Sequence, residues 1–125
     1  PQHRDVGTGV AHYRVAAHAL ASVAPGDPRA AVARASLHQK WMAEAPVMVA
    51  ITGEYRRCRA RYGERGIRYT HMEAGNVSQN LFLAAEALGL GAGIVGAFED
   101  QALIQALKLP PAHEPLLVMP VGYKS

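Results

Sequence analysis

The sequence holds a single cysteine, Cys58, among its 125 residues. One thiol can form neither an internal disulfide nor a cysteine-based metal site. The six histidines are scattered and show no metal-protease spacing, so no metal site is predicted. Cys58 lies among arginines and is interpreted as an incidental residue, with a reactive thiol as the alternative.

Long apolar runs are also missing. The best candidate, residues 81–98, is interrupted by Glu86 and by four glycines, which argues against a membrane-spanning helix. The first residues, PQHRDVGTG, lack the charged and then apolar layout of a secretion signal. We therefore expect a cytoplasmic protein with no membrane contact. Half of the residues are apolar, which suffices for a packed core in one domain over residues 1–125.

Lysine is scarce, and arginine is concentrated in one place. Six of the ten arginines lie between Arg56 and Arg68, interleaved with tyrosines in a way that could bind stacked bases and phosphates. Glu54 and Glu64 dilute this charge, and no nucleic-acid-binding motif accompanies it. We interpret the segment as a solvated helix face, with an anion- or substrate-binding edge as the alternative and no nucleic-acid partner.

Hydrophobic periodicity and turn signals predict mixed α and β structure around one sheet. Two β-compatible segments, residues 9–15 and 18–23, predict a hairpin, after which Asp27-Pro28 starts a helix with an aspartate N-cap. The nearly all-apolar run at 47–52 predicts a strand buried on both faces.

The remaining elements follow from the same signals. Gly63 and Gly66 are expected to break the chain between a helix and the longest helical pattern, residues 67–88. Pro120 indicates that the last strand is an edge strand or ends there. The predicted helices cover residues 29–36, 39–43, 54–62, 67–88 and 100–107, and the predicted strands 92–95 and 116–121.

Gly91, Gly93 and Gly96 match the letters of the dinucleotide motif G-x-G-x-x-G. That motif needs a strand before it and a helix N-terminus within it, because the helix amides hold the pyrophosphate. Here the order is reversed, since a helix precedes the glycines and a strand contains them. We therefore reject a dinucleotide site and infer that the glycines let the strand pass close to something flat.

The long helix carries an unusual polar stripe. Glu73, Asn76 and Asn80 fall on one helical face, and Gly75 beside them has no side chain. The stripe could face a ligand or a partner subunit that approaches the backbone closely. An exposed helix flank is the alternative.

Three stretches together resemble a known family. They are RYGERGIRY at 61–69, EAGNVSQNLFLAAEALGLGAGIVGAF at 73–98 and PLLVMPVGY at 115–123. In this order and spacing they are similar to the FMN-dependent nitroreductase-like superfamily, and most similar to its SagB-type and azoline dehydrogenase members. The segment GVAHYRVAAHALASVAPGDPRAAV at 9–32 resembles what those proteins carry before their middle helix.

The resemblance implies an FMN-binding α+β fold, a mixed sheet flanked by helices, and a homodimer in which both subunits line each flavin site. It places the long central helix at the dimer interface. The backbone of Val95, Gly96 and Ala97 matches the segment beside the flavin, where a bulky side chain would collide with the ring. Lys124 is the nearest match to the basic residues that reach the FMN phosphate.

Two departures from the family pattern matter. Complete members open with an Arg-Ser-x-Arg motif that anchors the FMN phosphate, and a Pro-Ser segment follows; this chain has neither. We therefore expect the C-terminal part of an incomplete domain, which by itself binds FMN weakly or not at all. The family's Lys-Tyr pair is matched here by Arg61-Tyr62, and because arginine stays protonated it cannot act as a base, which argues against azoline oxidation.

These residues lead to a hypothesis of function. We expect an FMN-dependent oxidoreductase that transfers hydride through its flavin to or from a small-molecule or peptide-derived substrate, with Tyr62 as proton donor or acceptor. One alternative is a generic nitro- or quinone reductase that uses NAD(P)H. The other is a catalytically inactive, dimerising scaffold module that lacks the FMN phosphate anchor.

Overall fold

The computed structural model describes residues 8–124. In chain order its elements are β1 (Gly9–Arg14), β2 (Ala19–Pro25), α1 (Arg29–Ala35), the 3-10 helix η1 (Lys40–Glu44), β3 (Val47–Gly53), α2 (Tyr55–Tyr62), α3 (Arg65–Ala87), β4 (Leu90–Ala92), α4 (Asp100–Leu107) and β5 (Glu114–Tyr123). Most predicted elements are therefore present, and α4 has the predicted bounds.

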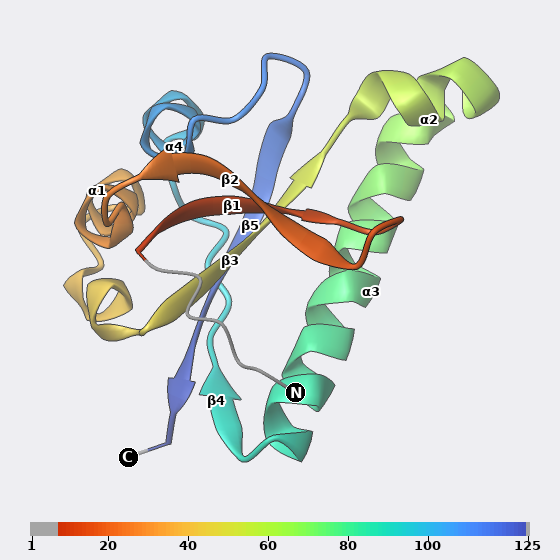
Figure 1. The fold of residues 1–125 in the computed structure, drawn as a ribbon. Helices are drawn as coiled ribbons and strands as arrows, with labels where there is room; N and C mark the ends of the chain where they lie inside the picture. The colour runs from red at the N-terminus through yellow and green to blue at the C-terminus, as the bar shows by residue number, and fades with distance from the viewer. Residues whose placement is uncertain (1–7, 125) are drawn as a thin grey trace.

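The strands form two sheets rather than the single sheet that was expected. β1 and β2 make an antiparallel hairpin, as predicted, and β3, β5 and β4 make a three-stranded antiparallel sheet in that order. Figure 1 shows α1 and α4 on one side of the larger sheet and α3 on the other, with the hairpin crossing in front. The sheet thus separates two helical layers.

The place of each strand in the larger sheet corrects two predictions. β5 is the central strand, so Pro120 does not mark an edge. The strand accommodates this proline because its carbonyl still accepts a hydrogen bond from the Gly93 amide, at 2.9 Å. β3, predicted to be buried on both faces, is instead the outer strand, and Val47 is 54% exposed.

The N-terminal boundary of α1 also differs from the prediction. Pro28 occupies the N-cap position, and Asp27 precedes it. Asp27 nevertheless accepts a hydrogen bond from the Arg29 amide at 3.0 Å and pairs with the Arg29 guanidinium at 2.7 Å. That guanidinium holds the pKa of Asp27 below its ordinary value. The aspartate thus stabilises the helix start from one residue further out.

The main hydrophobic core lies between the larger sheet and the layer of α1, η1 and α4. Met42 from η1 and Leu103 from α4 are completely buried there against Val118 of β5. Val95 joins this core through an isolated bridge to Val118, and it lies outside β4, which ends at Ala92. The predicted strand at 92–95 is therefore split in two.

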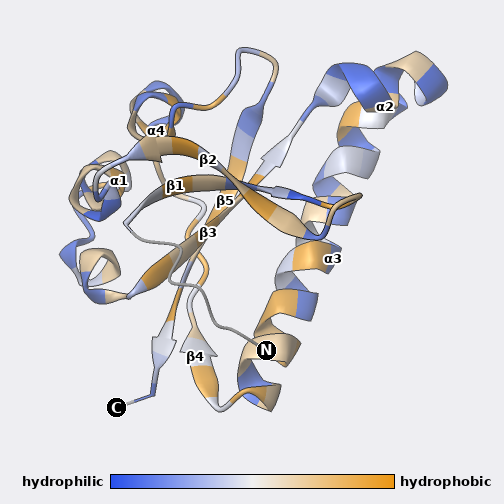
Figure 2. Ribbon diagram, viewed as in Figure 1, coloured by the Kyte–Doolittle hydropathy of each residue, from blue (hydrophilic) through white to orange (hydrophobic). Residues whose placement is uncertain are grey.

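The other sheet face is covered by α3, whose buried side is made of small residues. Small side chains let a helix approach a sheet closely, so α3 buries little apolar volume and leaves large side chains outside. Figure 2 shows apolar and hydrophilic residues alternating along α3 and mostly hydrophilic residues in α2. The buried residues of α3 are Gly66, Thr70, Ala74, Ser78 and Ala85.

The corner between α2 and α3 is built by two glycines with different roles. Gly63 ends α2 in a conformation with φ of +61°, as its predicted role as a helix breaker requires. Gly66 does not break the helix, because α3 already begins at Arg65. A Cβ at Gly66 would lie 2.6 Å from the carbonyl carbon of Cys58, so this glycine lets the two helices touch.

Candidate functional site

The segment Val95–Ala97 is anchored in the core at Val95 and becomes exposed at Gly96. Val95 is 4% exposed and is fixed by two hydrogen bonds with Val118, at 2.8 and 2.9 Å. Gly96 and Ala97, which follow it, are exposed. Gly96 does not have a positive φ, and a Cβ there would meet only the Leu117 side chain, at 3.8 Å. Neither backbone conformation nor packing within the described residues requires glycine at this position.

The other two glycines of the cluster have ordinary structural neighbours. A Cβ on Gly93 would lie 3.3 Å from the indole of Trp41, so the flat object beside this glycine is a side chain of the chain itself. A Cβ on Gly91 would meet the stem of Lys124 at 3.5 Å. Of the three glycines, Gly96 is the one whose open face could accept a ligand.

Lys124 directly follows β5, and its side chain reaches the C-terminal end of α3. Its ammonium group donates to both carboxylate oxygens of Glu86, at 2.8 and 2.9 Å. Both side chains are more than half exposed, so this ion pair contributes little to stability. Lys124 comes six positions after Val118, the partner of Val95, which corresponds to about 20 Å of extended strand.

Tyr62 lies at the opposite end of α3, in the α2–α3 corner. Its ring meets Tyr69 edge to face with centroids 5.1 Å apart, and the Arg61 guanidinium lies 5.5 Å from its centroid. Tyr62 is 50% exposed. Because the 23 residues of α3 span about 35 Å, one protomer does not bring Tyr62 and Lys124 together.

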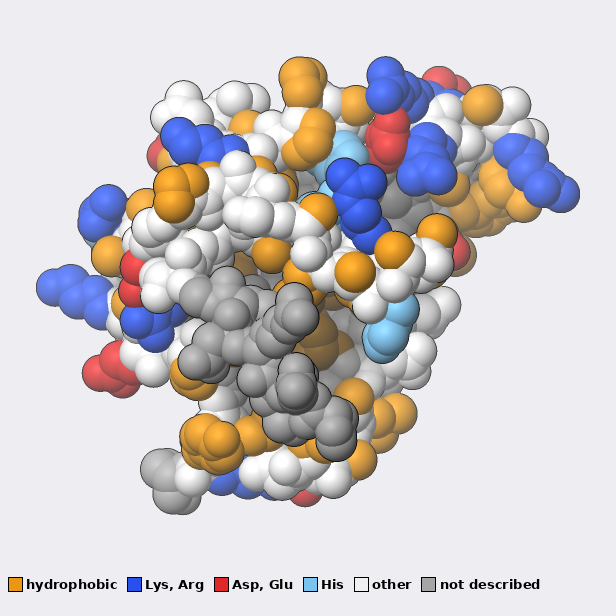
Figure 3. Space-filling model, viewed as in Figure 1, with side chains coloured by type: hydrophobic (Ala, Val, Ile, Leu, Met, Phe, Trp, Pro, Cys, Tyr) orange, Lys and Arg blue, Asp and Glu red, His pale blue; other side chains and the backbone are white. Residues whose placement is uncertain are grey.

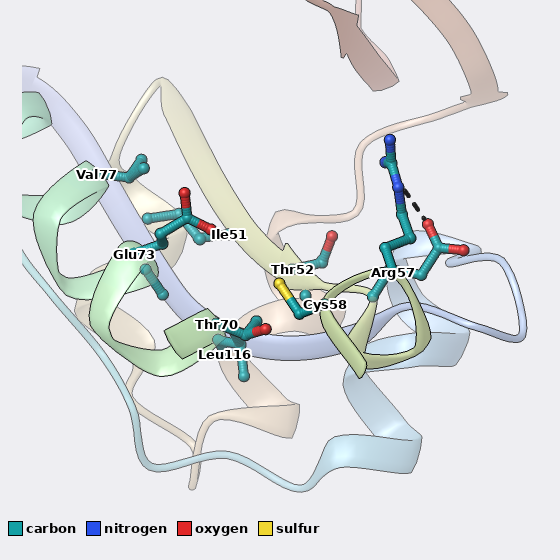
Figure 4. Close-up of a pocket in the computed structure, with 11 residues that line it drawn as sticks. Ile51, Thr52, Arg57, Cys58, Thr70, Glu73, Val77 and Leu116 are labelled. Atoms are coloured by element: carbon teal, nitrogen blue, oxygen red, sulfur yellow. Dashed lines mark ion pairs between the residues drawn. The ribbon is translucent and has the colours of Figure 1, made fainter. Parts of the chain in front are cut away.

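A pocket of about 410 Å³ opens between the end of β3, α2 and the middle of α3. Figure 4 shows Cys58 turning its sulfur towards this space from α2, with Thr70 and Glu73 facing it from α3. The Thr70 hydroxyl already donates to the Gly66 carbonyl at 2.7 Å. The pocket contains none of the residues predicted to bind flavin. Its apolar lining comes mainly from Ile51, Ala74, Val77 and Leu116.

Two polar pairs border this region. Glu54 accepts a hydrogen bond from the Arg56 guanidinium at 2.7 Å, and this bond holds the pKa of the Glu54 carboxyl below its ordinary value. The Tyr55 hydroxyl lies 2.8 Å from Nε2 of His71, and burial raises the pKa of Tyr55. Glu73 of the polar stripe lines the pocket, whereas Asn76 and Asn80 are exposed.

Comparison with known protein families identifies the family of this chain. A model described as the nitroreductase family matches residues 4–123. The chain belongs to the nitroreductase family. A Methanocaldococcus jannaschii protein named as a candidate nitroreductase is 41% identical over 119 residues, which are 95% of this chain and 59% of that protein. The chain therefore spans less than two thirds of this relative.

Solved structures confirm the α+β fold of this nitroreductase-family chain. A candidate nitroreductase from Anabaena variabilis superposes with a TM-score of 0.89 at 28% identity, over 96% of this chain and 25% of that one. The Escherichia coli microcin synthetase McbBCD, with truncated pro-MccB17 bound, gives 0.80 at 22% identity over 99% and 47%. The Vibrio harveyi NADPH:FMN oxidoreductase, complexed with NAD+, gives 0.67 at 22% identity over 78% and 46%.

Two further features of this nitroreductase-family chain bear on its chemistry. No helix within residues 8–124 is both long and apolar enough to cross a lipid bilayer. Over the same range, no three His, Cys, Asp or Glu side chains gather closely enough to hold a metal ion.

The sequence did not predict the pocket, because its lining comes from four separate elements. A weak signal for it was Glu73 in the polar stripe.

Proposed function

We propose that this chain is part of an FMN-dependent oxidoreductase that transfers hydride through the flavin. The observation that carries the proposal is the exposed backbone at Gly96, where glycine is required neither by φ nor by packing. Gly96 follows the isolated bridge of Val95 in irregular chain, and because it has no side chain a ligand can approach its backbone closely. Membership in the nitroreductase family supports a flavin as the object that this backbone faces.

The described residues fit one part of FMN better than the other. Gly96 and Ala97 would lie against the isoalloxazine ring, anchored by the buried Val95, and no side chain of Gly96 stands in the way. For the phosphate, the proposed ligand Lys124 is already paired with Glu86. When bound, FMN supplies the hydride chemistry, and the protein orients it and controls its surroundings.

Tyr62 is the proposed proton donor or acceptor. Its hydroxyl group lies on a half-exposed ring that Tyr69 and Arg61 hold in place. The contribution of this hydroxyl can be isolated with Tyr62→Phe, which keeps the ring packing. We expect slower turnover of the flavin-loaded protein at unchanged flavin affinity, and unchanged turnover would remove Tyr62 from the mechanism.

A flavin titration tests the function. We expect the 125-residue chain to bind FMN weakly and to bind riboflavin with the same affinity, because Lys124, the proposed phosphate ligand, is already paired with Glu86. The measurement is flavin fluorescence during titration with each compound. Much tighter binding of FMN than of riboflavin would contradict the weak-phosphate expectation, and absence of binding of both compounds would favour a flavin-free scaffold.

We further propose that the protein is a homodimer that packs through α3. This helix leaves Met72, Val77 and Leu83 about half exposed, at 57%, 49% and 59%. The same helix buries mainly small residues against its own sheet, so these three larger side chains stay largely in contact with water. Burying them against a second copy would remove this apolar surface from water.

Replacing Leu83 with Ser is expected to weaken that dimer about tenfold, because it removes one apolar side chain from the contact. Sedimentation velocity over a concentration series measures the effect. Leu37→Ser provides the matched control, since Leu37 is 63% exposed and lies on the opposite side of the sheet, after α1. A monomeric native protein, or equal effects of both variants, would contradict the proposed interface.

The substrate and the electron donor separate the enzymatic alternatives. Similarity to the microcin synthetase supports a peptide-derived substrate, and similarity to the NADPH:FMN oxidoreductase supports a generic NAD(P)H-dependent nitro- or quinone reductase. Arg61 in place of the SagB-type lysine favours the second of these. Oxidation of NADPH by the flavin-loaded protein, with and without a nitroaromatic acceptor, would distinguish them.

The non-enzymatic alternative is a flavin-free dimerising scaffold. The observation that favours it is the Lys124–Glu86 ion pair, because in it the proposed phosphate ligand Lys124 already has a carboxylate partner. A scaffold would keep the α3 dimer and show no response to flavin. Dimerisation together with a negative flavin titration would therefore support the scaffold over the enzyme.

A further inference from the structure

The net positive charge of this protein comes from one segment. Residues 54–68 contain six arginines and two glutamates, a net charge of +4, whereas the whole chain has a net charge of +3. The rest of the chain is therefore slightly negative. Protein surfaces usually mix both signs of charge, so this concentration departs from a simple solvated face. It lies on α2 and the start of α3, at the upper right of Figure 1.

Helix α2 contributes its arginines to the surface without burying any residue. The side chains of Arg56 and Arg57 are 75% and 80% exposed although both pair with Glu54. Figure 3 shows basic side chains gathered on this side of the molecule, with an acidic group among them. The helix is nevertheless held firmly, because Gly66 brings α3 into contact with its backbone.

Three arginines at the corner have no carboxylate partner among the described residues. Arg56 and Arg57 are paired with Glu54, and Arg59 lies 3.5 Å from Glu64. In this corner, the exposed arginines that remain unpaired are Arg61, at the end of α2, and Arg65 and Arg68, at the start of α3.

The aromatic side chains of the corner hold part of this cluster in place. The guanidinium of Arg61 lies 5.5 Å from the centroid of Tyr62, a cation–π distance. Tyr62 in turn meets Tyr69 edge to face. Arg61 therefore loses less conformational entropy on binding an anion than a freely rotating side chain would.

From these observations we propose that Arg61, Arg65 and Arg68 form a docking site for an acidic peptide segment. The chain itself indicates carboxylates as the preferred anions, because Glu54 and Glu64 already engage the neighbouring arginines at 2.7 to 3.8 Å. Arginine also matches carboxylates with its planar fork of donors. The site is short, since α2 has only eight residues, and it lacks the long basic groove that follows a nucleic-acid backbone.

The test compares two variants with the same change of net charge. The first, R61Q/R65Q/R68Q, removes the unpaired cluster. The second, R34Q/K40Q/K108Q, removes three exposed charges from the α1, η1 and α4 side of the sheet and is the control. The probe is a fluorescein-labelled hexaglutamate peptide, and its fluorescence anisotropy is measured at low ionic strength, where such contacts are strongest.

We expect the native chain to bind the peptide and the corner variant to bind it about tenfold more weakly, with the control within about twofold of native. A third variant, R61K/R65K/R68K, keeps the charge but loses the forked geometry and should show an intermediate loss. Unchanged melting temperatures establish that the variants are folded. If the glutamine variant does not fold, the comparison of the lysine variant with the native chain still tests the site.

Three results would overturn the proposal. Absence of binding by the native chain at low salt would remove the site. Equal losses in the corner and control variants would show that net charge alone attracts the peptide. Stronger binding of single-stranded DNA than of hexaglutamate, at the same salt concentration, would replace the acidic peptide with a nucleic acid. None of these outcomes depends on flavin, so the proposed oxidoreductase function stands or falls separately.

Discussion

Gly66→Ala is expected to lower the free energy of unfolding by about 2 kcal/mol, although alanine is the better helix former. The added Cβ would lie 2.6 Å from the Cys58 carbonyl carbon and 2.7 Å from the Arg59 nitrogen. Both are backbone atoms of α2, so no side-chain rotation can make room. The helix as a whole must move away from α3, and the contacts of the α2–α3 corner weaken with it.

Gly75→Ala is the matched control, because Gly75 lies in the same helix and a Cβ there meets nothing within 4 Å. It should stabilise the protein by about 0.5–1 kcal/mol, since alanine loses less backbone entropy in a helix than glycine does. Urea unfolding of both variants, at concentrations where the protein is monomeric, measures the difference. Changes of the same sign in both would mean that helix propensity, and not the close contact of α2 and α3, decides the outcome.

Gly66 also illustrates which structural features the sequence could predict. A glycine near a helix start gives the same local signal whether it ends one helix or lets a second helix pack closely against it. The prediction of a break was right for Gly63, whose φ of +61° is a local backbone property. It was wrong for Gly66, because the reason for that glycine is the backbone of Cys58 in a different helix.

The strands show the same division between local and long-range information. The β1–β2 hairpin is set by residues close in sequence, and its prediction was confirmed. The place of β3 depends on β5, whose pairing residues lie 61 to 74 positions later, and the apolar run of β3 could not indicate that it would be an outer strand. The position of Pro120 in the central strand depends on β4 and could not be predicted for the same reason.

The candidate site follows a similar rule. The open backbone at Gly96 was predicted from its resemblance to the family, and the structure accounts for the neighbouring Gly93 by Trp41, which lies about fifty residues earlier. The ion pair of Lys124 with Glu86 joins residues 38 positions apart, and no local sequence pattern predicts it. Contacts of this kind decide which matched residues remain available to a ligand.

Gly96→Leu is expected to reduce flavin binding by roughly a hundredfold while leaving the melting temperature of the flavin-free protein nearly unchanged. The stability expectation rests on geometry, since the backbone at Gly96 has no positive φ and a Cβ has only the Leu117 side chain near it, at 3.8 Å. The binding expectation rests on the proposed flavin site. A branched side chain placed between the backbone and a flat ring forces the two apart, and overpacking of this kind costs about 1–3 kcal/mol, which corresponds to roughly five- to hundredfold in affinity.

Gly96→Ala separates the flavin contact from a purely structural role. Alanine adds one methyl group, so its effect on flavin affinity should be partial, and its effect on stability negligible at a position with open space. The measurements are melting temperature without flavin and flavin affinity by fluorescence for both variants. If the melting temperature falls and the affinity does not change, Gly96 is needed by the fold and does not face the flavin. If affinity falls in proportion to the size of the side chain at constant stability, the bare backbone of Gly96 exists for the ligand, because the described protein itself makes no demand for glycine there.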